Sequence, residues 1–279
     1  MRFAVRRQLH ERGYVLITVL WIGLALLLAV SAYLATARQE ALAVRAEVGA
    51  ARALELARSG LNVALADLGR VNRDQTRSPV DGTPTALRMA EGIVTYRILD
   101  ESGKIDILMA PRQVIAPALV LVGEAENVDA FDAISVAETL ADFATQPDGS
   151  IGSVYGALLR AGFSGETATI AARYLTTLNF SAQVNPRTAP RTVLEAIPGL
   201  GPSDVAEIMA RREAGRPMPP LGSAAAWLAE RNGPVYTIEA EARLTTGAQA
   251  VLQAQVAQRG LSFRGGLMDY EVLTVRQIR

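Results

Sequence analysis

The sequence lacks the side chains on which much enzyme chemistry depends. It contains no cysteine, which excludes disulfides, thiolate metal sites and thiol nucleophiles. Its one histidine, His10, lies in the N-terminal segment, so the rest of the chain has no imidazole for general base catalysis or zinc binding. No P-loop, nucleophile-elbow or dinucleotide-binding motif is present either. We therefore expect no enzyme, although clustered carboxylates in a hydrolase pocket stay an open alternative.

The chain also has no net charge. Lysine plus arginine and aspartate plus glutamate number 28 each among 279 residues. A balanced chain has no overall field that attracts nucleic acid or an anionic surface. Half of the residues are hydrophobic, which suits one anchor plus one or two packed domains.

Charge is missing altogether between Arg12 and Arg38. A bilayer core needs about 20 apolar residues in a helix, and the stretch 14–37 provides slightly more. Four arginines precede it, which predicts a cytoplasmic N-terminus and a translocated remainder. The apolar run is longer than that of an ordinary cleaved secretory signal. The sequence thus predicts a single-pass membrane protein.

Helical periodicity continues past this run as far as Leu68, with apolar residues on one stripe. We predict one long helix over 14–69, transmembrane over 14–37. It is either a plain tether with a helical stalk or a rod that assembles with other helices.

Two β-rich regions flank a block of short helices. Alternation over Ile93–Leu99 and again over 236–278 predicts an antiparallel sheet formed by 90–110 and 234–279. A loop rich in glycine and proline over 69–85 precedes it. The fold class predicted is α+β: a long N-terminal helix packed on an antiparallel sheet, with a large helical insertion over 111–233. Helices are predicted in this insertion over 114–122, 134–143, 154–161, 166–177, 192–196, 203–212 and 223–230.

One segment of the insertion is typical of a helix-hairpin-helix. Gly199 and Gly201 permit positive φ, while Ile197 and Leu200 fill the hairpin before the helix 203–212. Free amides at that helix start, with arginines 211, 212 and 216 nearby, would suit a phosphate and suggest a membrane-anchored DNA receptor. Acidic residues lower the positive charge of this patch, so we favour a hairpin that packs protein against protein and expect no nucleic acid partner.

Metal binding has weak candidates only. Asp142 and Asp148 are the two carboxylates of the segment 142–149, whereas calcium takes about six to eight oxygens. A capped helix end followed by a turn is the interpretation that we prefer, and we expect no cofactor.

The order of these features resembles the minor pseudopilin K family of type II secretion. Arg12-Gly13 precedes the apolar run, Trp21 lies within it, and Asp100-Glu101-Ser102-Gly103-Lys104-Ile105 forms a strand turn. Val184-Asn185-Pro186-Arg187-Thr188-Ala189-Pro190 leads into the helical hairpin at Ile197-Pro198-Gly199-Leu200. The similarity covers nearly the whole chain.

The resemblance implies removal of the leader 1–13 by prepilin peptidase after Gly13 and methylation of the new N-terminus at Tyr14. It implies a single-pass protein of the bacterial inner membrane with its bulk in the periplasm. It further implies as partners the I- and J-type minor pseudopilins, the major pseudopilin, the inner-membrane assembly platform and secreted proteins. The family is associated with calcium in its insertion, but Ala141–Thr145 departs from its acidic, tryptophan-containing pattern, so no calcium ligand is carried over.

The fifth residue of the mature chain would be Thr18, where most pilin-like subunits have glutamate. A carboxylate inside the membrane costs a few kcal/mol unless it is paired, and threonine cannot form an ion pair with a neighbouring terminal amine. A subunit without this acceptor, and with a bulky insertion on top, suits the tip of a fibre.

Overall fold

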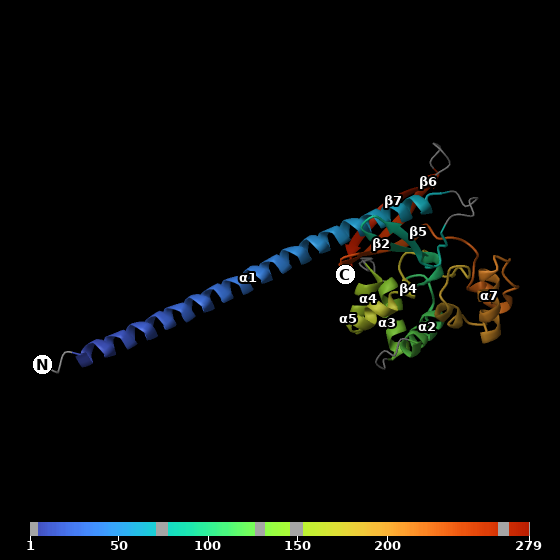
Figure 1. Ribbon diagram of the computed structural model, residues 1–279. Helices are drawn as coiled ribbons and strands as arrows, with labels where there is room; N and C mark the ends of the chain where they lie inside the picture. Colours follow the sequence, from blue (N-terminus) through green and yellow to red (C-terminus); the bar gives the residue numbers. More distant parts are fainter. Residues whose placement is uncertain (1–4, 71–77, 126–131, 146–152, 262–267, 279) are drawn as a thin grey trace.

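The structure is a computed structural model that describes residues 5–70, 78–125, 132–145, 153–261 and 268–278. A long helix, α1 (Val5–Leu68), leads into two packed parts at its far end (Figure 1). We call these two parts together the head, and the residues 14–52 of α1 the rod. The expected α+β class is confirmed.

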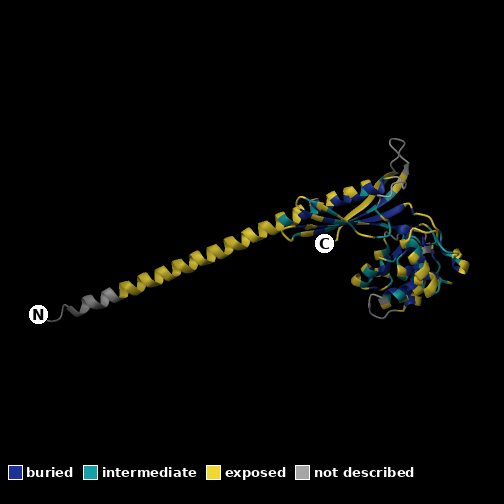
Figure 2. Ribbon diagram, turned by 45° about the vertical axis from the view of Figure 1, so that its right-hand side comes forward, coloured by how far each residue is buried: buried dark blue, intermediate teal, exposed yellow. Residues whose placement is uncertain are grey.

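The rod is exposed and only the last part of α1 is buried (Figure 2). From Ala53 onward small residues face the sheet, and at Gly60 the helix comes so close that an added Cβ would overlap the Val94 side chain. Alanine and glycine at this contact let the helix axis approach the strands closely. The predicted stripe is therefore buried only from Ala53, while Leu42 and Ala46 are exposed.

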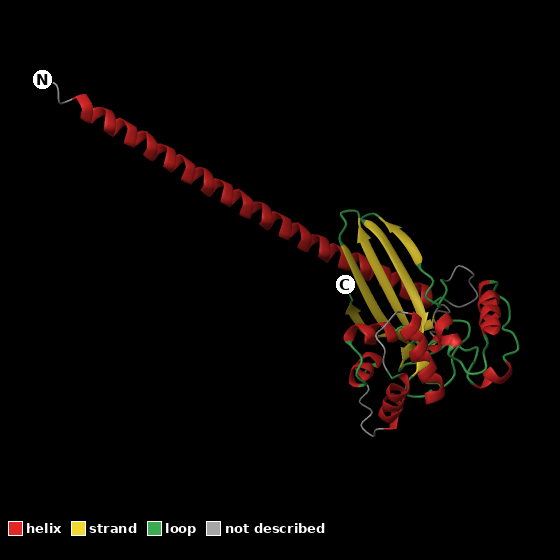
Figure 3. Ribbon diagram, turned by 90° about the horizontal axis from the view of Figure 1, so that it is seen from below, coloured by secondary structure: helices red, strands yellow, loops and turns green. Residues whose placement is uncertain are grey.

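The sheet is antiparallel and has the order β1-β2-β5-β6-β7 (Figure 3). In β2 (Gly92–Asp100) and β5 (Val235–Leu244) alternate side chains are buried against α1, which confirms the predicted strands. The turn predicted at Thr246-Gly247 is also present, with Gly247 at a φ of +90°. The other strands are β1 (Thr85–Met89), β6 (Gln249–Leu261) and β7 (Met268–Gln277).

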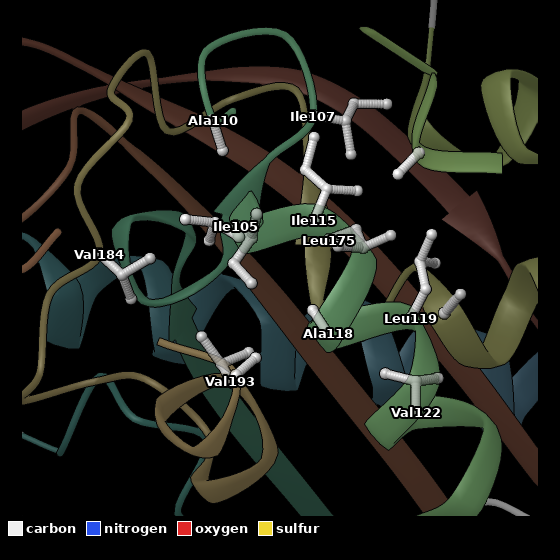
Figure 4. Packing of buried hydrophobic residues seen from close by; sticks show 14 of the residues in the cluster. Ile105, Ile107, Ala110, Ile115, Ala118, Leu119, Val122, Leu175, Val184 and Val193 are labelled. Carbon is white, nitrogen blue, oxygen red and sulfur yellow. The ribbon is translucent and has the colours of Figure 1, made fainter. Parts of the chain in front are cut away.

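Between β2 and β5 the chain forms the helical part of the head, which has its own hydrophobic core. Figure 4 shows Ile115, Leu119 and Val122 of α2 beside Leu175 and Val193 from distant segments. Its helices are α2 (Arg112–Ala125), α3 (Ala133–Thr145), α4 (Val154–Arg160), α5 (Gly165–Ala171), α6 (Arg191–Glu195) and α7 (Pro202–Glu213), with short 3-10 turns η1 (Glu101–Gly103) and η2 (Gly222–Ala226).

Four local expectations were wrong. Strand β1 was missed, because 86–89 had no assignment and the sheet was expected to begin at residue 90. The segment 104–107 does not extend the antiparallel sheet. Its strand β3 (Ile105–Asp106) pairs in parallel with β4 (Leu175–Thr176). The helix predicted over 166–177 ends at Ala171, since the amides of Ile105 and Ile107 donate to carbonyls at 174 and 176. The helix predicted over 223–230 is only the 3-10 turn η2.

Candidate assembly surface

The rod presents bulky apolar side chains to its surroundings. Tyr14 is 74% exposed and Trp21 is 65% exposed. Among the described residues, one helix is long and apolar enough to cross a bilayer, and its most apolar 18-residue window has a mean hydropathy of 2.6 with none of it buried. Apolar area on this scale is stable only in lipid or against other helices. The rod is thus the main candidate for an assembly surface.

The positions expected to matter for processing lie at the start of this surface. Gly13 and Tyr14 are consecutive residues of the unbroken helix α1. The Thr18 hydroxyl donates to the Tyr14 carbonyl over 2.9 Å, so it is already hydrogen-bonded within its own helix. Such a bond lets a neutral hydroxyl sit in an apolar segment at little cost. Thr18 brings no charge to this surface.

A groove of about 1030 Å³ lies where the rod meets the head. One wall is α1 from Val44 to Arg52, and the other is formed by the sheet turns at Glu91 and at 244–249. Gly49 lies close to the turn at 244–249, since a Cβ added to Gly49 would lie 3.2 Å from the Cβ of Ala248. The groove therefore continues the exposed rod surface onto the base of the sheet.

The head is held together by a buried cluster that we call the polar joint, formed by Asp100, Glu101, Lys104, Thr176 and Thr237. Glu101 is 2% exposed and its carboxylate accepts from Lys104 Nζ at 2.8 Å, Thr237 Oγ1 at 2.7 Å and Thr176 Oγ1 at 2.5 Å. Lys104 directly follows the η1 turn, Thr237 lies in β5 of the large sheet, and Thr176 lies in β4 of the helical part. One carboxylate thus connects both parts of the head.

The two carboxylates of the polar joint are shifted in opposite directions. Burial raises the pKa of Glu101, but the Lys104 ammonium and the hydrogen bonds from Lys104, Thr176 and Thr237 outweigh it, so its pKa lies below 4.5. Burial raises the pKa of Asp100 from 3.8 to about 6, although amide donors at Ser102 and Gly233 oppose the shift. Glu101 is therefore an ion-pair anchor, while Asp100 titrates just below neutral pH.

The structure brings together two of the sequence segments that carry the family resemblance. The Asn185 amide donates to the Ser102 carbonyl at 2.8 Å. A Cβ at Gly103 would lie 2.7 Å from the backbone carbon of Thr188, so only glycine fits between the two segments. The turn at 100–105 and the segment 184–190 form one tightly packed unit. The sequence shows both motifs, but it shows neither the contact between them nor the role of Glu101.

The helical hairpin of α6 and α7 is packed on this unit. Ile197 is 2% exposed, Leu200 is half-buried against the same core, and Gly199 has a φ of +89°. Gly201 has a φ of −91° and is the N-cap of α7, so it does not use the positive φ that glycine permits. Its amide donates to Asp204 Oδ2 at 2.8 Å, which places a carboxylate where a phosphate would bind.

The hairpin arginines are largely used inside the protein. Arg212 Nη2 donates to the carbonyls of Pro186 and Ala189, each at 2.6 Å. Arg211 bonds the Glu207 carboxylate at 2.9 Å. Guanidinium groups held this way are poor counter-charges for a phosphate backbone. This geometry favours the protein-packing interpretation over the DNA receptor.

Only one of the two metal candidates lies in the described part of the chain. Asp142 lies exposed in α3, and Asp148 lies outside the described residues. Within the described part of the chain, no three histidine, cysteine, aspartate or glutamate side chains gather as a metal site would require.

Comparison with known proteins gave one kind of match. No family model matches the chain, and no curated protein matches it. The chain is similar to a chain in the crystal structure of the GspK-GspI-GspJ complex from the enterotoxigenic Escherichia coli type 2 secretion system. The TM-score is 0.47 and the sequence identity is 13%, and the match covers 87% of this chain and 99% of that chain. Likeness at this level is too weak to assign a family.

Proposed function

We propose that this protein is a minor pseudopilin of the type II secretion system, positioned at the tip of the periplasmic pseudopilus. The observation that carries the proposal is the exposed apolar rod, which is continuous with a helix packed on the sheet of the head. A helix of this kind can move from lipid into a bundle of similar helices without exposing its apolar surface to water. The Arg12-Gly13 junction and the motifs at 100–105 and 184–190 support the same role.

The neutral Thr18 and the bulky head support a place at the tip. In this position the rod needs neighbours only on the side towards the fibre, and the head covers the end of the assembly. The subunit starts or caps assembly for the export of folded proteins together with I- and J-type minor pseudopilins and the major pseudopilin. It spans the inner membrane once, with its N-terminus cytoplasmic, and needs neither cofactor nor catalysis.

Mass spectrometry of the protein extracted from native membranes tests the processing step. We expect a chain that begins at an N-methylated Tyr14, and co-purification with other pseudopilins. A Gly13→Leu variant should keep residues 1–13, whereas a Gly23→Ala variant, where an added Cβ meets nothing within 4 Å, should be processed normally. An intact N-terminus at Met1 together with no pseudopilin partner would contradict the proposal.

A further inference from the structure

The rod carries charges at a regular spacing just beyond its transmembrane part. Arg38, Arg45 and Arg52 follow each other at seven-residue intervals, and so do Glu40 and Glu47. A helix turns by about 100° per residue, so residues seven apart stay on nearly the same side and form two charged lines. A strip of small and β-branched apolar residues lies between the two lines. It consists of Ala37, Ala41, Val44, Val48 and Ala51.

The middle of this strip lies on a different side of α1 from the sheet, although Val44 and Val48 also border the groove at the base of the head. Val44 is 58% exposed and Val48 is 45% exposed. The side of α1 towards the sheet is marked by Gly49 and Ala53, which lie about 140° around the helix from the middle of the strip. A second helix can therefore approach the strip from the side of α1 that does not pack on the sheet.

None of the five charges makes an ion pair within the described chain. Side chains pair along one helix when they are three or four residues apart, as Glu55 and Arg58 do at 2.7 Å. Glu40 and Arg45 are five residues apart, and so are Glu47 and Arg52. At this offset the two side chains of each pair point to different sides of the helix.

A five-residue offset is the one that joins two parallel helices. In a parallel coiled coil, position g of one helix pairs with position e of the following heptad in the other. With the strip at positions a and d, both glutamates fall at g and all three arginines fall at e. We propose that a second copy of this chain docks in parallel and in register along this strip, so that Glu40 and Glu47 of each copy pair with Arg45 and Arg52 of the other.

The occupant is a second copy because the pattern is complementary to itself. Two copies in one bilayer are parallel, and their identical apolar spans hold them at the same height, which sets the register. Alanines at 37, 41 and 51 allow the helix backbones to come close. Val44 and Val48 also line the groove at the base of the head, so docking covers part of that apolar surface.

Cysteine cross-linking tests the contact cleanly because the chain has no cysteine of its own. Val44→Cys places a thiol at position d, and Ala43→Cys places one outside the strip, about 100° away around the same helical turn. In membranes that contain this chain alone, we expect oxidised dimer at residue 44 to exceed that at residue 43 at least about fivefold, since disulfides need close Cα positions. Equal cross-linking at both positions, or none at residue 44, overturns the proposal.

Charge exchange tests the pairing. In the Val44→Cys background, Glu40→Arg with Glu47→Arg makes both lines basic, and Arg45→Glu with Arg52→Glu makes both acidic. Each variant alone should lose most of its dimer, and mixing the two should restore it as a mixed dimer; high salt should weaken that pairing. Dimer that is indifferent to these changes overturns the proposal. Because no other secretion protein is present, the result is independent of whether the chain joins a pseudopilus.

Discussion

Replacing Glu101 by glutamine should destabilise the head far more than the loss of an ordinary surface carboxylate. The change leaves the Lys104 ammonium, whose side chain is only 10% exposed, without its counter-charge. Breaking a buried ion pair by removing one partner costs about 3–5 kcal/mol. Glutamine keeps one acceptor oxygen for Thr176 or Thr237, so we expect a loss of about 3 kcal/mol in the free energy of unfolding.

Urea unfolding of the full chain in detergent micelles measures this loss. A Trp21→Phe background leaves Trp227 as the only tryptophan, so its fluorescence reports on the head alone. The matched control is Glu91→Gln, an exposed carboxylate at a sheet turn, which should change stability by less than about 0.5 kcal/mol.

Adding Lys104→Met to Glu101→Gln should recover part of the loss, because the unpaired buried charge is then gone. The expected coupling between the two substitutions is about 1 kcal/mol or more. If the two losses simply add, or if Glu101→Gln behaves like the surface control, the assignment of Glu101 as the anchor of the head is wrong.

The pH dependence gives a second readout of the same residue. Because the pKa of Glu101 is lower in the folded protein than its ordinary value of 4.5, its stabilising contribution is present above pH 4.5 and is lost as pH falls below that value. The glutamine variant should lack this particular loss in acid.

Three further substitutions test the packing and the second carboxylate. Gly60→Ala should destabilise by about 1–3 kcal/mol despite alanine's higher helix propensity, and Val94→Ala should partly rescue it in thermal unfolding. The pKa of Asp100 is raised from 3.8 to about 6, so its protonation stabilises the fold fully below pH 3.8, and this contribution is lost as pH rises through 6. Asp100→Asn should remove this pH dependence from the free energy of unfolding measured across this range. Gly199→Ala puts a side chain at a φ of +89° and should cost about 1–2 kcal/mol, read as a lower midpoint of urea unfolding.

The parts of the fold that could be predicted are those with long, regular patterns. The charge-free stretch, the helical stripe up to Leu68 and the alternation in β2 and β5 each extend over many residues and decide the α+β class. By contrast, β1 has five residues and forms a hairpin with β2 directly after it, while β4 has two residues and pairs with the distant β3. Local propensity is too weak to fix such short strands, because pairing with a partner strand decides them.

The same limit applies to the polar joint. The sequence shows Glu101 and Lys104 at a turn, which is a fair hint of an ion pair. It does not show that Thr176 and Thr237, 75 and 136 residues away, donate to the same carboxylate. The processing role of Gly13 and Tyr14 and the assembly role of Thr18 follow from sequence motifs alone and stay predictions.

Because α1 runs as a single helix from the rod into the sheet contact, the number of residues between them sets the direction in which the head faces. Each residue inserted between Arg38 and Val48 would turn the head by about 100° relative to the apolar stretch 14–37 and raise it by about 1.5 Å. A seven-residue insertion would raise it by about 10 Å and change its facing by only about 20°. The number of residues in this segment therefore determines which side of the head faces a neighbour bound to the apolar stretch 14–37.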